Sequence, residues 1–306
     1  MTNLTEQELR LFEGVNEGDI AKIDVAVDNG AAVNIFGDQY GLYRNVSPLE
    51  YAFYSDASVD LIARLIERGA KVGELNDFRK RTIIEIAICF YGDNAVVDVL
   101  LRAGAQFPTE QHRCAFEGNI EALRALNATE VGVGRAKSAS GCTPLHYAVG
   151  SGRLDVVQWL LKEGGAMVCD TDAFGLTALS CAASKGHLEI VKWLLEQGGA
   201  TITERTRRGL TVLLCAASKG RLGVVQWLLE KGGATIDEKD EEDNTALLFA
   251  ARGGSLKTVQ WLLQHGASLE EKNAQGESAI DLMPGDENKK KLLQLDVRPS
   301  EQAGAR

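Results

Sequence analysis

Basic residues, histidines and long apolar runs are scarce in this chain of 306 residues, and each shortage argues against a class of protein. The 33 lysine and arginine residues are outnumbered by 43 aspartate and glutamate residues, which gives a formal net charge of −10. A nucleic-acid partner is therefore not expected, because phosphate binding requires a basic face. No apolar run approaches the roughly 20 residues of a membrane span. The polar beginning, MTNLTEQELRLFEG, also lacks the apolar core of a signal peptide. We expect a cytoplasmic protein without a membrane span.

Residues that bind metals or act as nucleophiles are few and lack the required spacing. The six cysteines show no CxxC pairing, and the four histidines do not combine with carboxylates at ligand spacing. We therefore expect no metal, no cofactor and no enzymatic activity. Free thiols in a reducing compartment are the simplest interpretation of the cysteines.

Repetition is what the sequence has in abundance. Nearly the same motif occurs four times, as WLLKEGGA (159–166), WLLEQGGA (193–200), WLLEKGGA (227–234) and WLLQHGA (261–267). Residues 175–208 and 209–242 are identical at 22 of 34 aligned positions. A phrase repeated at a fixed period is typical of stacked units, each of which completes the core of its neighbour.

Each copy predicts two short helices. Threonine precedes the first helix and is a good N-cap, because its hydroxyl accepts a backbone N–H that has no partner in the helix. The threonines are Thr143, Thr177, Thr211 and Thr245. This inner helix is small and apolar, with Pro144 at its first position in one copy, and it should end at a glycine. The glycines are Gly152, Gly186, Gly220 and Gly254. An outer helix follows, with apolar residues at helical spacing, and then a polar loop or hairpin such as ATITERTRR.

The pattern resembles the ankyrin repeat. The resembling segments are SPLEYA (47–52), GCTPLHYA (141–148) and AASKGHLEIVKWLLEQGGA (182–200). The resemblance implies an all-α repeat solenoid of stacked helix–turn–helix units with projecting hairpin loops. One departure is a second glycine, at Gly165, Gly199 and Gly233, which gives a period of 34 where the family usually has 33. We expect this glycine to loosen the end of the outer helix.

About nine units, including atypical end caps, can be aligned along the chain. Residues 1–140 are interpreted as degenerate repeats with an N-terminal cap, and residues 141–275 as four strong repeats. Residues 276–295 are interpreted as a C-terminal capping half-repeat, and residues 296–306 as a disordered tail. The acid excess lies mostly in the first part, because residues 1–140 carry 14 basic and 21 acidic groups.

Several reactive-looking residues are interpreted as structural. Cys181 and Cys215 lie one period apart on the inner helix, where a small buried side chain fills a tight stack better than a reactive thiol pair would. The alternative for His112 and Cys114 is an enzyme hidden in the degenerate units, but adjacent helix positions do not face each other. For His146 and His187 we expect loop hydrogen bonds, as in the resembling family. Cys169 lies in a hairpin, with no base nearby in sequence.

The four tryptophans allow two interpretations. Trp159, Trp193, Trp227 and Trp261 lie at identical repeat positions. Packing between adjacent outer helices is favoured over an aromatic stripe for a partner, because identical positions favour identical packing.

The resemblance implies that function lies on the surface, since the family binds partner proteins through hairpin tips and inner helices. We hypothesise a non-catalytic interaction scaffold that grips an acidic and apolar peptide or domain over residues 172–253. The alternative is that these charges only solvate the stack. The predicted partner-binding residues are Phe174, Leu176, Lys185, Arg205, Arg207, Arg208, Leu210, Lys219, Glu241, Glu242 and Arg252.

The resemblance also implies a monomer. A second functional hypothesis is a secreted effector of an intracellular bacterium, which would act in the host cytosol and capture a host protein through the repeats. This hypothesis depends on a similarity between the repeated Trp-Leu-Leu and Gly-Gly-Ala motifs and the repeats of such organisms.

Overall fold

A computed structural model describes residues 4–36, 46–55, 57–73, 82–91, 94–129 and 132–296. The chain divides into two compact units, Met1–Ser151 and Gly152–Arg306. Across the described ranges the regular elements are helices, joined by loops that contain two isolated β-bridges. The tail predicted to be disordered lies, from residue 297 onward, outside the described residues.

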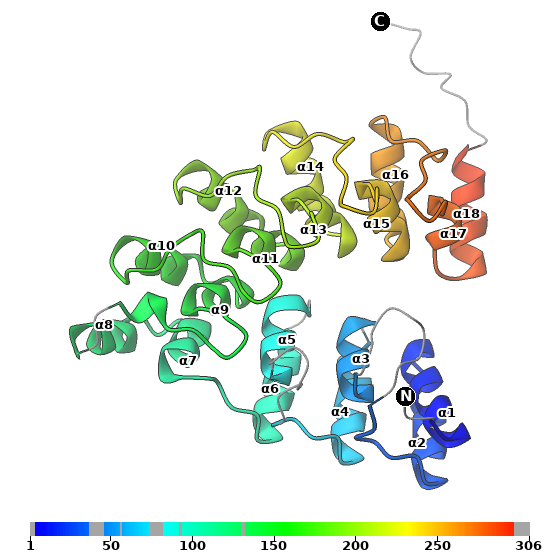
Figure 1. Ribbon diagram of the computed structural model, residues 1–306, viewed down its shortest axis with the longest axis horizontal. Helices are drawn as coiled ribbons and strands as arrows, with labels where there is room; N and C mark the ends of the chain where they lie inside the picture. The colour runs from blue at the N-terminus through cyan, green and yellow to red at the C-terminus, as the bar shows by residue number, and fades with distance from the viewer. Residues whose placement is uncertain are drawn as a thin grey trace, which may run out of the picture. The chain divides into compact units, whose positions relative to one another are not determined.

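The first unit contains four helix pairs and one further inner helix (Figure 1). The pairs are α1 (Glu6–Glu17) with α2 (Ile20–Asp28), α3 (Pro48–Tyr54) with α4 (Val59–Glu67), α5 (Ile83–Phe90) with α6 (Ala95–Arg102), and α7 (Glu110–Glu117) with α8 (Ile120–Thr129). A 3-10 turn, η1 (Val133–Arg135), leads to the last inner helix, α9 (Pro144–Gly150). Inner helices contact inner helices, and the outer helices α2, α4 and α6 contact one another in succession, so these helices form a stack of two layers.

The second unit continues the alternation of outer and inner helices. Its outer helices are α10 (Leu154–Lys162), α12 (Leu188–Glu196), α14 (Leu222–Glu230), α16 (Leu256–Gln264) and α18 (Asp286–Asp296). Its inner helices are α11 (Ala178–Lys185), α13 (Val212–Ser218), α15 (Ala246–Arg252) and α17 (Ala279–Leu282). Each inner helix contacts the next inner helix, and each outer helix contacts the next outer helix. The predicted helical repeat solenoid is confirmed.

Inner helices are short because their sequence fixes both ends. Thr177, Thr211 and Thr245 are the N-caps of α11, α13 and α15, and each hydroxyl accepts the backbone N–H three residues later. The predicted glycine stop holds only for α11, which ends directly before Gly186. The other inner helices of the strong repeats end two residues before their glycine, which has a positive φ in the turn to the next outer helix.

In three hairpins of the second unit, a glutamate ties the hairpin to the N-cap threonine of the preceding inner helix. Glu204 accepts the Thr201 backbone N–H at 3.0 Å through Oε1 and the Thr177 hydroxyl at 2.6 Å through Oε2. The same two bonds recur at Glu238 with Thr211 and at Glu271 with Thr245. We call this arrangement the threonine–glutamate clamp. Because it recurs in three successive units, it orients each hairpin in the same way relative to its helix pair.

The paired glycines accommodate the tryptophan rings. A Cβ on Gly164, Gly198 or Gly232 would come within 2.9 Å of an atom of the indole ring in the same repeat. Beyond the pair, the Ala200 N–H bonds the Leu194 carbonyl at 3.0 Å, and equivalent bonds follow the other two pairs. The expected loosening of the helix end stays a prediction. The copy with one glycine uses a different contact, in which His265 stacks on Trp261 at a centroid distance of 3.7 Å.

Replacing Glu238 by alanine should lower the stability of the second unit. The change leaves the Thr211 hydroxyl and the Thr235 backbone N–H without their carboxylate acceptor, and hydrogen bonds to charged groups contribute about 1.5–3 kcal/mol. The midpoint of guanidinium denaturation should fall accordingly. Glu230→Ala, which removes an exposed glutamate at the end of α14, is the matched control and should leave the midpoint nearly unchanged. Equal shifts in the two variants would contradict a structural role for the clamp.

Candidate partner-binding surface

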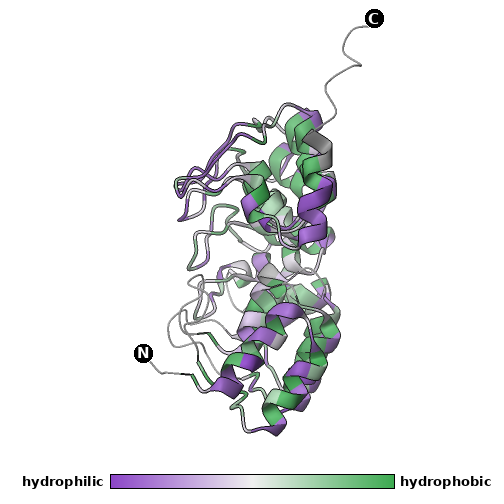
Figure 2. Cartoon of the chain, turned by 90° about the vertical axis from the view of Figure 1, so that its right-hand side faces the viewer, coloured by the Kyte–Doolittle hydropathy of each residue, from purple (hydrophilic) through white to green (hydrophobic). Residues whose placement is uncertain are grey.

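The hairpins of the second unit extend to one side of the helices and are hydrophilic toward their ends (Figure 2). Each turn is built on a polar residue that accepts backbone N–H groups ahead of it. Asp172 Oδ1 accepts from Phe174 at 2.8 Å and from Leu176 at 3.0 Å, and Asp240 Oδ1 makes the equivalent pair of bonds. Thr206 and Asn273 occupy the same position in their hairpins. These side-chain bonds hold the tips in defined turns.

Neighbouring tips are also joined to one another. The Arg207 N–H donates to the Phe174 carbonyl at 3.1 Å, and the Ala274 N–H donates to the Glu242 carbonyl at 2.8 Å. Between them, the Arg205 guanidinium donates to the carbonyls of Gly209 at 2.8 Å and Lys239 at 3.0 Å. Consecutive tips therefore form a connected ladder of backbone groups.

Five of the predicted partner-binding residues are exposed, and one of them, Arg205, also bonds across the ladder. Arg207 and Arg208 lie on one tip, and Glu241 and Glu242 lie on the next. A cationic tip thus adjoins an anionic tip on a backbone that hydrogen bonds hold in place. Phe174, Leu210 and Lys219 are half-buried.

The other predicted residues have different surroundings. Leu176 and Lys185 are buried, with 8% and 6% of their surface exposed, so they do not present a binding surface. Arg205 holds two tips together through its carbonyl bonds, and Arg252 contacts Asn244 at 3.3 Å and Glu277 at 3.6 Å. The turn-forming roles of Asp172 and Asp240 were not predicted from the sequence. The recurrence of a polar residue at this position in each copy is the signal that could have revealed them.

The pair His112 and Cys114 is built into the core of the first unit. His112 Nδ1 lies 2.8 Å from Thr109 Oγ1, and its Nε2 lies 3.0 Å from the Cys142 carbonyl oxygen. Burial lowers the pKa of His112. Burial raises the pKa of the Cys114 thiol to about 11, and the nearby Glu110 carboxylate acts in the same direction. A thiol with this pKa is protonated near neutral pH, so it lacks the thiolate that nucleophilic catalysis requires.

The other reactive-looking residues also have structural surroundings. Cys181 and Cys215 are buried on their inner helices, and burial raises the pKa of Cys215 to about 12. Cys169 is exposed. His146 accepts the Thr143 backbone N–H at 3.2 Å, and the ring of His187 covers Gly152.

The tryptophans are largely enclosed. Trp159 and Trp193 are buried, and Trp227 and Trp261 are half-buried. Lys162 Nζ lies over the Trp193 ring at 5.7 Å, which favours packing within the outer layer over an open aromatic stripe.

The described ranges contain no group of three or more histidine, cysteine or acidic side chains that could hold a metal ion. None of the helices described is both long and apolar enough to cross a membrane.

Comparison with known families identifies the repeats. Residues 111–206 match a family model described as "Ankyrin repeats (3 copies)". Residues 213–263 match a second model, "Ankyrin repeats (many copies)". A comparison with curated proteins finds no match.

The tip at Asp243 offers a test of turn geometry. Asp243 has φ of 60°, at the position where the neighbouring hairpins have Gly175, Gly209 and Gly276, and it is the one non-glycine residue with positive φ in the described ranges. Asp243→Gly should raise the free energy of unfolding by about 1 kcal/mol, because left-handed backbone costs a residue with a Cβ roughly that much. Asp237→Gly, at an exposed site of the same hairpin, is the control and should not stabilise. Chemical denaturation distinguishes them, and an Asp243→Gly variant no more stable than the parent would contradict the strain.

Thiol labelling tests the placement of the cysteines. In a Cys89→Ser background, Ellman's reagent at pH 8 should modify Cys169 rapidly. Cys114, Cys142, Cys181 and Cys215 should react only after unfolding, since all four are buried. The raised pKa values of Cys114 and Cys215 keep both thiols protonated up to pH 9, so raising the pH to 9 should not expose them to fast labelling. Rapid loss of a second thiol in the folded protein would contradict this assignment.

Proposed function

The chain belongs to the ankyrin-repeat family, and on this premise we propose that it is a non-catalytic scaffold that binds a partner protein on its hairpin tips between residues 172 and 253. Ankyrin repeats are generally protein–protein interaction modules. The proposal assigns the contacts to Arg207 and Arg208, with Glu241 and Glu242 on the adjoining tip.

One observation carries the proposal, namely that Arg207 and Arg208 are exposed on a tip whose backbone is bonded on both sides. The Arg207 N–H bonds the preceding tip, and the Arg208 carbonyl accepts the Glu241 N–H of the following tip at 3.4 Å. A partner that binds there restricts the motion of the side chains but does not have to order the tip backbone. A preorganised backbone reduces the entropic cost of association. Arginine is also among the residues that most often dominate protein interfaces.

The chemistry of the tips suggests the partner's chemistry. Two guanidinium groups favour carboxylates, which they bind through paired hydrogen bonds. The half-buried Phe174 and Leu210 supply apolar area beside them. Glu241 and Glu242 would repel acidic groups placed one tip further along, and so would fix the partner's register. We therefore propose an acidic and apolar peptide or domain as the partner of a cytoplasmic, monomeric scaffold.

A charge-reversal variant tests the tip. Arg207→Glu combined with Arg208→Glu should abolish retention of the partner from a cytosolic lysate, because acidic groups would then face acidic groups. Captured proteins are quantified by mass spectrometry against the parent chain. The melting temperature should stay unchanged, since both arginine side chains are exposed.

The matched control reverses the same number of charges away from the tips. Lys231 and Lys257 are exposed at the ends of outer helices α14 and α16, and their replacement by glutamate should leave retention intact. A partner that is retained equally by the tip variant and by the control would place the binding surface elsewhere.

A further inference from the structure

The stack of the first unit is interrupted where its fourth helix pair begins. Only residues 103–109 connect α6 to α7, whereas residues 163–177 connect α10 to α11 and form a full hairpin. Inner helix α9 contacts both α7 and α5 (Figure 1). Outer helices α6 and α8 make at most marginal contact, and Leu123 is the buried residue of α8. The shortened connection thus coincides with a break in the outer layer.

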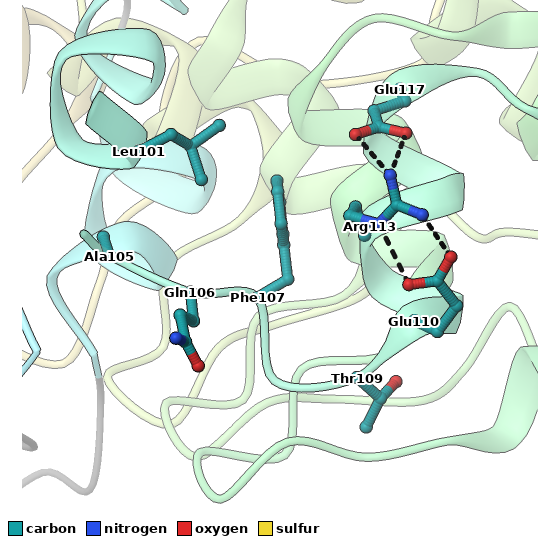
Figure 3. Close-up of a pocket in the computed structure, with 8 residues that line it drawn as sticks. All are labelled: Leu101, Ala105, Gln106, Phe107, Thr109, Glu110, Arg113 and Glu117. Atoms are coloured by element: carbon teal, nitrogen blue, oxygen red, sulfur yellow. Dashed lines mark hydrogen bonds and ion pairs between the residues drawn. The ribbon is translucent and has the colours of Figure 1, made fainter. Parts of the chain in front are cut away.

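A groove of about 380 Å³ lies at this break, between the end of α6 and helix α7 (Figure 3). Leu101 and Ala105 line it from the α6 side, and Glu110, Arg113 and Glu117 line it from α7. The Phe107 ring stands between the two sides (Figure 3). Its orientation is fixed by contacts with Phe116 at a centroid distance of 5.6 Å and with Tyr147 at 6.0 Å.

The segment around Phe107 borders a second cavity in addition to the groove. A second cavity of about 580 Å³ is lined by Gly73, Thr82, Glu85 and Lys137 together with the same Gln106, Phe107 and Thr109. Gln106, Phe107 and Thr109 therefore line both hollows, and they lie where other repeats have a hairpin. The space suits several side chains of an extended or helical segment better than one enclosed small ligand, because it is open to solvent.

The charge on the groove is acidic. Arg113 Nε lies 2.9 Å from Glu110 Oε2, and Arg113 Nη1 lies 3.0 Å from Glu117 Oε2, so one guanidinium faces two carboxylates. The hydrogen bond from Arg113 lowers the pKa of Glu110, which keeps this carboxylate charged at neutral pH. The surrounding sequence has the same sign, with 21 acidic and 14 basic groups in residues 1–140.

We propose that this groove is a second interaction surface, distinct from the hairpin tips, which binds a basic and apolar segment of a partner protein. An apolar side chain of the segment packs on Phe107 and Leu101. A lysine or arginine beside it pairs with the carboxylate charge that Arg113 leaves uncompensated at Glu110 and Glu117. A second copy of this chain fits the groove less well, because an interface between two acidic halves would bring like charges together.

Defined peptides test the proposal on the full chain by fluorescence anisotropy. A labelled twelve-residue peptide of alternating arginine and leucine should bind, and peptides of alternating glutamate and leucine or arginine and serine should bind at least about tenfold more weakly. Phe107→Ala should weaken the first peptide by more than about tenfold, the loss typical of a central interface residue. Phe107→Leu, which keeps an apolar side chain, should retain most of the affinity and show that the site has not unfolded.

Charge reversal has an internal control. Glu110 and Glu121 are both exposed helical glutamates that pair with an arginine three residues later. Glu110→Lys should weaken the arginine–leucine peptide, and Glu121→Lys, outside the groove, should not. Hydrogen exchange should show protection of residues 103–113 when the peptide binds.

Four results would overturn the proposal. They are equal binding of the glutamate–leucine or arginine–serine peptide, equal losses in Glu110→Lys and Glu121→Lys, protection confined to other segments, and failure of all three peptides to bind. Arg207→Glu with Arg208→Glu should leave the affinity for this peptide unchanged, so the groove and the tip surface succeed or fail separately.

Discussion

The hydrogen bond between an N-cap threonine and a hairpin glutamate is the constraint on which the second unit depends. It joins the first turn of an inner helix to the loop that follows the next outer helix, as at Thr177 and Glu204. Since the same carboxylate also holds the hairpin's own backbone, the loop cannot pivot without breaking two bonds. The tip ladder and the exposure of Arg207 and Arg208 follow from loops that are held in this way.

The repeat architecture could be read from the sequence because its determinants are local. Thr177, Thr211 and Thr245 cap helices through neighbours three residues away, and the period of the tryptophan phrases fixes the order of the helix pairs. The candidate surface was harder to predict from the sequence. The residue types of Lys185 and Leu176 are known from the sequence, but their burial depends on the neighbouring repeats. Arg205 illustrates the same limit, because its acceptor at Lys239 lies one repeat away. The break between α6 and α8 depends on how α5, α7 and α9 pack, which no single segment specifies.

The two surfaces differ in the way they arise from the repeat. The tips use positions at which each unit is free to vary while its backbone stays fixed, as Arg207 and Glu241 show. The groove beside Phe107 arises instead where a unit loses part of its hairpin and the outer layer no longer closes. The tip surface thus presents the cationic pair Arg207 and Arg208 beside an anionic tip, whereas the groove beside Phe107 is acidic.

The threonine–glutamate clamp has a consequence for how such a chain changes length. Both members of a clamp lie within one period, since Thr177 and Glu204 fall in residues 175–208, and Thr211 and Glu238 fall in residues 209–242. Duplication or loss of a whole period therefore adds or removes both members of a clamp. No threonine hydroxyl or glutamate carboxylate is left without its hydrogen-bond partner. The 22 identities between these two segments fit a history of such duplication. The chain can therefore gain or lose whole periods at little cost in stability. Insertion of a partial period would separate a threonine from its glutamate and would cost more.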